Sequence, residues 1–258
     1  MFVDNLFFQF VSELKNFPSL LISFFNFIVC LIAIYIVRKR FGYAGLCSYM
    51  VLSSVIANIQ VLYATSYEIL NIEVLLGTVI FCSSFLACDL INIEYGPEKA
   101  KRAVYLTIFT DLFFLLNIIL TLGHKPIDYT QFTNFSISEK TMNSNISAIH
   151  QIFLPIPRLL IASYLAYLFS QLGEIWLLNF TDKLTWFKSK FIKHNLSLFV
   201  SNVCLDTIVF TSIGMWILSS EPLNLNDFWQ ICFSAIIVRV ICNLGNTFFI
   251  KILKNNKF

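Results

Sequence analysis

The chain has 258 residues, of which 57% are hydrophobic and only 13% are charged, and its formal net charge is +3. Soluble domains carry about 25% charged residues, so this composition excludes an ordinary soluble protein. The unbroken apolar runs approach the roughly 20 residues that a membrane-spanning helix needs, whereas the strands of a membrane barrel alternate in polarity. The sequence therefore predicts an all-α fold, a polytopic transmembrane helical bundle of six or seven spans.

The apolar runs predict a single integral membrane domain that covers residues 1–258. Residues 1–16 mix phenylalanines with charges and are expected to form a short helix at the membrane surface. Residues 124–150 form the only long polar connection. If the first apolar run, residues 17–37, does not span the membrane, a core of six membrane-spanning helices is left. The seven predicted spans cover residues 17–37, 44–66, 73–93, 103–123, 151–179, 195–219 and 228–250.

Basic residues gather between the predicted spans and predict the orientation of the chain. Cytoplasmic loops of membrane proteins carry an excess of Lys and Arg, so all four basic clusters are expected in the cytoplasm. This places the N-terminus outside and the C-terminus inside a bacterial cytoplasmic membrane. No stretch interleaves basic residues with exposed aromatics, so we expect no nucleic-acid partner. The clusters lie at residues 38–40, 99–102, 183–193 and 251–257.

Several ionisable residues fall inside the apolar runs. Each charge near the bilayer centre costs about 2.5–3.5 kcal/mol on insertion scales, so such groups must be paired, hydrated or used. They predict a polar pocket within the bundle, and therefore transport. A membrane enzyme and a non-transporting scaffold are the alternatives. The six residues are Asp89, Asp111, Arg158, Glu174, Asp206 and Arg239.

Catalytic and metal-binding signatures are missing from the sequence. The patterns G-x-S-x-G and H-E-x-x-H are absent, and the three histidines lie scattered at segment edges. The seven cysteines sit in apolar stretches without metal-binding spacing. We therefore expect no enzyme activity, no metal and no cofactor.

The last two spans carry a candidate ion pair. Asn202 and Asp206 are four residues apart and share a helix face. Arg239 falls at a similar depth in the next span, and consecutive helices joined by a short turn are usually neighbours. An Asp206–Arg239 pair is therefore expected. It either fixes packing alone or leaves Asp206 or Asn202 facing a ligand.

The fifth predicted span carries a polar face made of Tyr164, Tyr167, Gln171 and Glu174. Such a face can hydrogen-bond a planar polar ligand while its rings stack on it. The alternative is a stripe of interhelical hydrogen bonds. Arg158 lies off this face, near the outer end, where it either guards a mouth or extends its charge to the interface.

Asp111 and Asp89 complete the candidate polar residues. Asp111, near mid-bilayer in the fourth span, is either a proton carrier or paired with Asn117 or a neighbouring helix. Asp89 opens a dense polar segment at the cytoplasmic end of the third span. Within that segment Gly96 is suited to stop one helix and Pro97 to start the next.

Four ordered segments resemble signatures of the queuosine precursor transporter family, also called the vitamin-uptake-like integral membrane family. The resemblance spans roughly residues 45–250. Where that family has an acidic residue after the asparagine of its third-helix motif, this chain has Ile93. The segments are Ser54–Val61, the Asp-Leu-Ile-Asn-Ile-Glu-Tyr-Gly run from Asp89 with the basic residues after it, Arg158–Tyr167 with Gln171, and Asn202–Thr207 with Phe210.

The resemblance implies import of 7-deazaguanine bases for tRNA queuosine salvage, namely the cyano or aminomethyl pre-queuosine base or queuine. The family also resembles the substrate-binding subunits of energy-coupling-factor transporters, which depend on separate ATPases. An energy-coupling ATPase module is therefore a candidate partner, and a subunit of this type for another vitamin-like molecule is the alternative function. The chain has no G-x-x-x-x-G-K-[ST] loop of its own. The predicted substrate-binding residues are Asp206, Asn202, Gln171, Tyr164, Tyr167, Arg158, Asp89 and Arg239.

Overall fold

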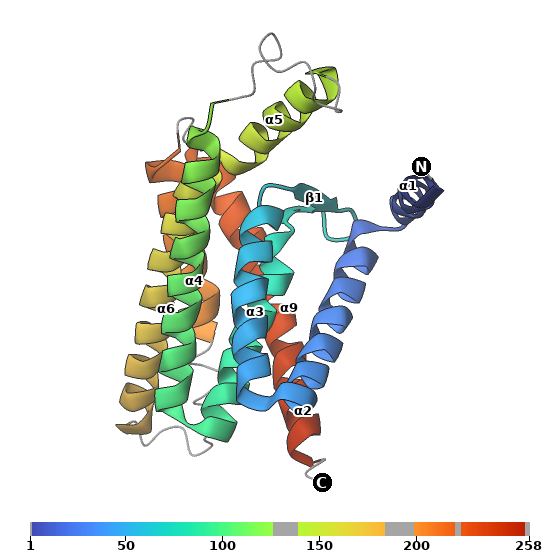
Figure 1. Cartoon of the computed structure of the whole chain (residues 1–258). Coiled ribbons are helices and arrows are strands. Elements are labelled where there is room, and N and C mark those ends of the chain that lie inside the picture. The colour runs from blue at the N-terminus through green and yellow to red at the C-terminus, as the bar shows by residue number, and fades with distance from the viewer. Residues whose placement is uncertain (1, 126–138, 184–198, 220–222, 256–258) are drawn as a thin grey trace.

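A computed structural model of the chain describes residues 2–125, 139–183, 199–219 and 223–255 (Figure 1). In these residues the fold is a bundle of long helices with one small β-hairpin at one end, which confirms the predicted helical membrane bundle. Five described helical stretches are long and apolar enough to cross a membrane, and a shorter apolar helix covers Val203–Ile217. The division into seven spans stays a prediction, although each predicted span has a helical counterpart.

The first long helical element bends back on itself. After α1 (Phe2–Leu14), α2 runs over Ser19–Gln60, which would measure about 63 Å if it were straight, twice the apolar core of a bilayer. Gly42 breaks it with a positive φ of 55° and a ψ of −131°. Cys30 and Ala57 consequently pack in the same hydrophobic cluster despite their separation in sequence. The two arms of α2 are the counterparts of the predicted spans 17–37 and 44–66.

Glycine is required at this bend for two reasons. The φ of Gly42 lies in a region that side chains with a Cβ rarely adopt, and a Cβ there would meet the Tyr95 hydroxyl at 3.0 Å. At Gly45 a Cβ would collide with the carbonyl oxygen of Val37 across the bend. The bend therefore permits close approach of the two arms of α2.

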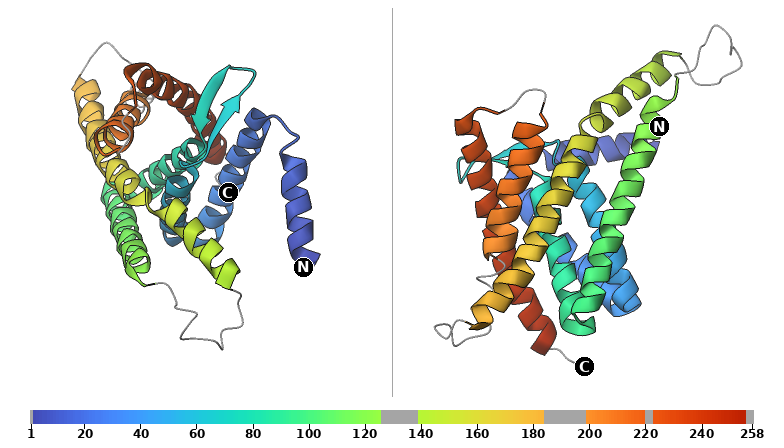
Figure 2. Two further views of the ribbon diagram at one scale, coloured as in Figure 1. Left: turned by 90° about the horizontal axis from the view of Figure 1, so that it is seen from above. Right: turned by 90° about the vertical axis from the view of Figure 1, so that its left-hand side faces the viewer.

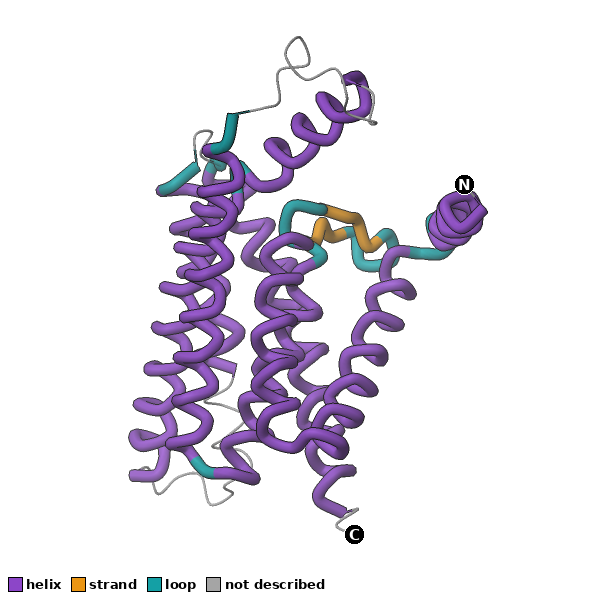
Figure 3. The backbone as a smooth tube through the Cα atoms, in the orientation of Figure 1, coloured by secondary structure: helices purple, strands orange, loops and turns teal. Residues whose placement is uncertain are grey.

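A β-hairpin follows α2 and was not predicted. Strands β1 (Ala64–Tyr67) and β2 (Ile72–Leu75) pair antiparallel, so the predicted span ends at residues 66 and 73 were wrong. Tyr67 and Val74 are buried in a cluster with residues of α3 and α9, and this burial holds the hairpin over the bundle. The strands lie at the end of the bundle from which α1 leaves (Figure 3).

Helices α3 (Gly77–Tyr95) and α4 (Pro97–Gly123) form the predicted helical hairpin. Gly96 ends α3 with a φ of 89° and a ψ of 165°, a conformation that is essentially restricted to glycine. Pro97 occupies the first turn of α4, where its missing N–H costs no helical hydrogen bond. The sequence prediction for this turn is confirmed.

Part of the polar connection is helical. Helix α5 (Glu139–Phe153) leans away from the bundle and α6 (Ile156–Lys183) begins after it, so the predicted start of the fifth span at residue 151 falls inside α5 (Figure 2). Pro155 and Pro157 lie at the junction. Proline is favoured in the first turn of a helix and disfavoured inside it, which accounts for a boundary here.

The remaining elements pack beside α6. A π-helical segment η1 (Phe199–Leu205), the short helix α8 (Asp206–Thr211) and a second π-helical segment η2 (Ser212–Ile217) form one continuous rod. The last helix, α9 (Leu225–Asn255), packs against α8 and α3. Single π-turns often mark functional sites in helices.

Charged residues at two helix turns lie at the same end of the bundle. Arg38, before the bend of α2, forms a 2.5 Å ion pair with Glu94 at the end of α3. The Lys99 ammonium lies over the rings of Tyr43 and Tyr95. The C-terminal end of α9 points to this same end, opposite the β-hairpin (Figure 1). For the clusters at 38–40, 99–102 and 251–257 this agrees with the expectation of one shared side, and residues 184–193 of the remaining cluster lie outside the described residues.

The outer faces of the long helices expose large apolar side chains. A bilayer would cover such surfaces, whereas water would not. Together with the long apolar helices, they identify a multi-pass membrane protein. The most exposed on α4 and α9 include Phe109, Phe113, Phe233, Leu244 and Phe248.

Candidate functional site

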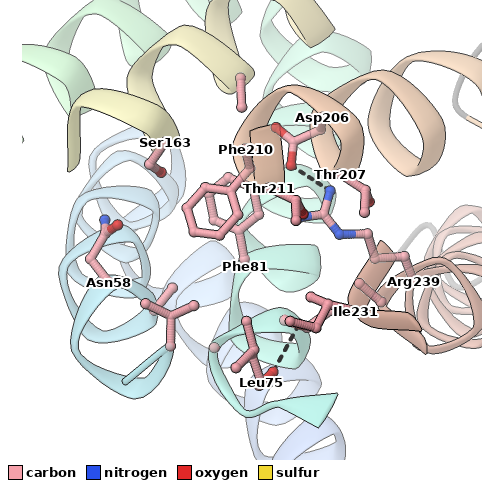
Figure 4. A pocket seen from close by; sticks show the side chains of 16 residues that line it. Asn58, Leu75, Phe81, Ser163, Asp206, Thr207, Phe210, Thr211, Ile231 and Arg239 are labelled. Carbon is pink, nitrogen blue, oxygen red and sulfur yellow. Dashed lines mark hydrogen bonds and ion pairs between the residues drawn. The ribbon is translucent and has the colours of Figure 1, made fainter. Parts of the chain in front are cut away.

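A large cavity lies among α2, α3, α6, α8 and α9, under the β-hairpin. It is open on one side and has about 50 Å³ in which the centre of a water molecule fits. Like other sites for small molecules, it combines apolar walls with a few polar groups. The polar groups in this wall are all contributed by helices (Figure 4).

The predicted ion pair forms one wall of this cavity. The Arg239 guanidinium donates from Nη1 to Oδ2 of Asp206, as the dashed line in Figure 4 marks. Asp206 is 1% exposed and Arg239 is 6% exposed, so both charges are removed from water and need each other. Asp206 stands where the π-helical segment η1 passes into α8. Among the described residues, its other oxygen accepts a long hydrogen bond, 3.5 Å, from the Ser170 hydroxyl.

Two phenylalanines supply flat apolar surface. Phe81 of α3 and Phe210 of α8 both line the cavity and are labelled in Figure 4. The guanidinium carbon of Arg239 lies 5.5 Å from the centre of the Phe81 ring, within the range of a cation–π contact. The charged pair and an aromatic face therefore border the same space.

Neutral polar groups complete the lining. The Asn58 amide donates to the Ser54 carbonyl at 2.9 Å, and the Thr207 hydroxyl donates to the Val203 carbonyl at 2.5 Å. With these donors used inside their own helices, the oxygens of both side chains keep acceptor capacity. Asn58 lies across the cavity from Asp206 (Figure 4). The described residues contain no group of His, Cys, Asp and Glu that would hold a metal ion.

A second, smaller cavity lies on the other side of Phe81. It has about 10 Å³ in which the centre of a water molecule fits. Its wall includes Asp111, which accepts a 2.6 Å hydrogen bond from the Ser54 hydroxyl. Of the alternatives for Asp111, the pairing with Asn117 was wrong: Asn117 donates to the carbonyl of Phe113, and the neighbouring helix α2 supplies the partner.

Tyr164 and Tyr167 line this smaller cavity and not the larger one, which corrects the expectation of one shared pocket. Along α6 the larger cavity is reached by Ser163 and Ala166, one residue earlier in each case. One residue turns an α-helix by about 100°, so α6 presents one face to each cavity.

Two further predicted site residues line neither cavity. Arg158 is half-buried near the start of α6 and donates to the Ser219 hydroxyl at 3.0 Å, and neither it nor Asp89 belongs to the described lining of either cavity. The side chains of Gln171, Glu174 and Asn202 lie outside the described residues. Any contact of these residues with substrate stays a prediction.

Several lining residues were not singled out from the sequence as site residues. Ser163, Thr207 and Phe210 belong to segments that carried the family resemblance, so that pattern was the available signal. No sequence pattern marked Phe81 or Thr211 as a site residue, because an aromatic residue or a threonine in an apolar helix most often belongs to the packed core. Their role depends on which helices surround them.

Comparison with known proteins matches residues 75–253 to the family described as "Putative vitamin uptake transporter". A protein of Bacillus subtilis (strain 168) named "Probable queuosine precursor transporter" is 28% identical to the chain over 195 residues. This alignment covers 72% of the chain and 75% of the Bacillus protein. No solved structure matches the chain.

Proposed function

Because the chain belongs to the vitamin uptake transporter family, a family of membrane transporters, we propose that it imports a 7-deazaguanine base for tRNA queuosine salvage. The observation that carries this proposal is the cavity beside Asp206 and Arg239. The name of the Bacillus relative supplies the substrate class. The candidate substrates are the cyano and aminomethyl pre-queuosine bases and queuine.

The chemistry of the cavity suits a flat heterocycle. A guanine-like edge presents N–H groups that a carboxylate accepts in parallel, and its carbonyl oxygen accepts from a guanidinium. Phe81 and Phe210 offer faces on which the ring system stacks, an interaction worth about 1–3 kcal/mol per base in other proteins. Asp206, Arg239 and Phe81 are therefore proposed as the central substrate contacts.

The proposed orientation follows from the basic clusters. With the N-terminus outside and the C-terminus in the cytoplasm, the β-hairpin end of the bundle faces outward in a bacterial cytoplasmic membrane. The cavity lies nearer to that end, because Leu75 and Gly77 contribute to its wall. Substrate would therefore enter from the hairpin side. The proposal needs no ATPase module, since it assigns transport to this chain alone.

A growth assay tests the proposal. The gene is expressed in a bacterial strain that can neither make nor import queuosine precursors, each of the three bases is supplied, and tRNA is separated on a boronate gel that retards queuosine-containing tRNA. We expect retardation with at least one base and none without it. Absence of retardation with all three, while the protein is present in the membrane, would refute the proposal.

A pair of variants ties the assay to the cavity. The double substitution Asp206→Asn with Arg239→Gln removes both charges without leaving either alone, and it should abolish retardation. The control Asp227→Asn makes the same chemical change at an exposed residue that contacts Asn224, outside both cavities, and should leave retardation unchanged. Retardation that appears only when an energy-coupling ATPase module is co-expressed would show that the chain works as a subunit of a larger transporter and not alone.

A further inference from the structure

Asp111 is a buried acid without a basic neighbour in the part of the chain that the structure describes. It lies mid-way along α4 and is 2% exposed. Its Oδ2 accepts the hydrogen bond from Ser54, and its Oδ1 has no hydrogen-bond partner among the described residues. A carboxylate at this depth is strongly disfavoured unless a positive charge or a proton neutralises it.

The groups that face Asp111 come from three other helices. From α6 the titratable groups are the phenols of Tyr164 and Tyr167, from α2 there is Ser54, and from α3 Phe81 and Ser84, none of which carries a positive charge. The Tyr164 hydroxyl is buried and has no hydrogen-bond partner among the described residues. Among the described residues no side chain neutralises Asp111, which leaves a proton or another cation bound in the cavity as the source of neutralisation.

The size of the cavity favours a proton. The centre of a water molecule has about 10 Å³ of space in the smaller cavity, and one bound water needs about 10–15 Å³ by the same measure. The cavity therefore has room for about one water-sized group. A proton requires one carboxylate oxygen, whereas a metal cation requires several oxygen ligands around it. The hydroxyls of Ser54 and Thr107 donate to Asp111 and to the Ala103 carbonyl respectively, and Oδ1 of Asp111 is left without a hydrogen bond among the described residues. One unpartnered carboxylate oxygen, in a space for about one water molecule, is the arrangement of a proton site.

The two cavities share a wall. Phe81 and Ser163 line both of them, and Phe81 also packs edge-on against Phe85 at 5.1 Å between ring centres. A ligand that stacks on Phe81 in the larger cavity presses on a side chain that borders Asp111 in the smaller one. This gives a direct route by which substrate occupancy and the protonation of Asp111 affect each other.

We propose that Asp111 carries the proton that drives import: its carboxylate binds a proton from the outer side, and the carboxyl group releases it to the cytoplasm as the base crosses. This inference rests on the proposed function, because it names the energy source of that transport. No covalent bond of the substrate changes, and one proton moves inward in each cycle.

The test uses the full-length protein in sealed lipid vesicles. Two quantities are followed for each of the three bases: exchange of labelled for unlabelled base without any ion gradient, and net accumulation under an inward pH gradient, with a pH-sensitive dye inside. For an uncharged base and one proton, a gradient of one pH unit supports about tenfold accumulation. We expect the wild-type protein to accumulate the base and to acidify the lumen as it does so.

The variant Asp111→Asn keeps the shape of the side chain and removes its proton. It should exchange base like the wild type but accumulate none above equilibrium. Accumulation unchanged in Asp111→Asn, net uptake of base without lumen acidification in the wild type, or accumulation driven by a sodium gradient alone would each overturn the inference. Absence of exchange by the wild-type protein would instead overturn the proposed function, and this inference with it.

A chemical readout covers the case in which Asp111→Asn does not fold. Dicyclohexylcarbodiimide adds to a protonated carboxyl group in apolar surroundings and leaves a stable N-acylurea. Wild-type protein treated in vesicles is mapped by mass spectrometry. Label on Asp111 together with lost acidification supports the proton site, and an unlabelled Asp111 contradicts it.

Discussion

Two buried aspartates face two neighbouring cavities, and their surroundings differ in one respect. Asp206 shares its cavity with the guanidinium of Arg239, whereas Asp111 faces hydroxyls and rings only, among the described residues. A paired acid can stay charged and orient a polar ligand, and an acid without a counter-ion can be neutralised only by what enters. The comparison assigns substrate recognition to Asp206 and energy coupling to Asp111, in line with the two proposals.

The sharpest way to break this comparison is to make the same substitution at both acids. Asp206→Asn leaves the guanidinium of Arg239 buried without its counter-charge, and loss of one partner of a buried pair costs about 3–5 kcal/mol. If Asp111 is protonated, Asp111→Asn replaces one neutral group by another and should lower the free energy of unfolding by about 1 kcal/mol. Unfolding of the purified protein in detergent measures both.

Neutralising both members of the pair provides the control. The double variant Asp206→Asn with Arg239→Gln should be more stable than Asp206→Asn alone, because no unpaired charge is left. If Asp206→Asn and Asp111→Asn were destabilised equally, the two acids would not differ in the way described.

The shared wall gives a second test. Phe81 borders both cavities, whereas Phe210 borders only the larger one. Phe81→Ala should weaken binding of the base by about 1–3 kcal/mol and also reduce proton-driven accumulation relative to exchange. Phe210→Ala should weaken binding by a similar amount and leave the ratio of accumulation to exchange unchanged. Calorimetry and the vesicle assay read the two quantities separately, and identical ratios in both variants would contradict coupling through Phe81.

The smallest expected effect concerns the hydroxyl beside each acid. Ser54 lies 2.6 Å from Asp111, while Ser170 lies 3.5 Å from Asp206 and donates to the Tyr167 carbonyl at 3.0 Å. Ser54→Ala should therefore lower the stability by about 1 kcal/mol, and Ser170→Ala by about 0.5 kcal/mol or less. Thermal unfolding in detergent distinguishes them, and a larger loss in Ser170→Ala would show that the Ser54 contact contributes little.

Features set by local sequence were predicted correctly. The turn at Gly96 and Pro97 follows from backbone conformations that only these residues favour, and the Asp206–Arg239 pair follows from depth and from the adjacency of consecutive helices. The membrane bundle itself follows from the length of the apolar runs.

Features that depend on packing were not predicted. Residues Ala166 and Tyr167 are adjacent in sequence and line different cavities, because the position of α6 among its neighbours decides which side of it meets which space. The hairpin over residues 64–75 was missed since its alternation is short, and Tyr67 becomes a buried residue only against α3 and α9. The pattern of polar and apolar residues along one helix does not determine how the other helices pack around it.

Equilibrium binding of each 7-deazaguanine base to purified protein tests the division between the two acids most directly. Titration calorimetry would be performed on the wild type, on Asp111→Asn and on the double variant Asp206→Asn with Arg239→Gln. The division predicts that Asp111→Asn binds with nearly wild-type affinity and that the double variant loses about tenfold or more, the equivalent of one charged hydrogen bond. Wild-type affinity in the double variant, with binding lost in Asp111→Asn, would contradict it.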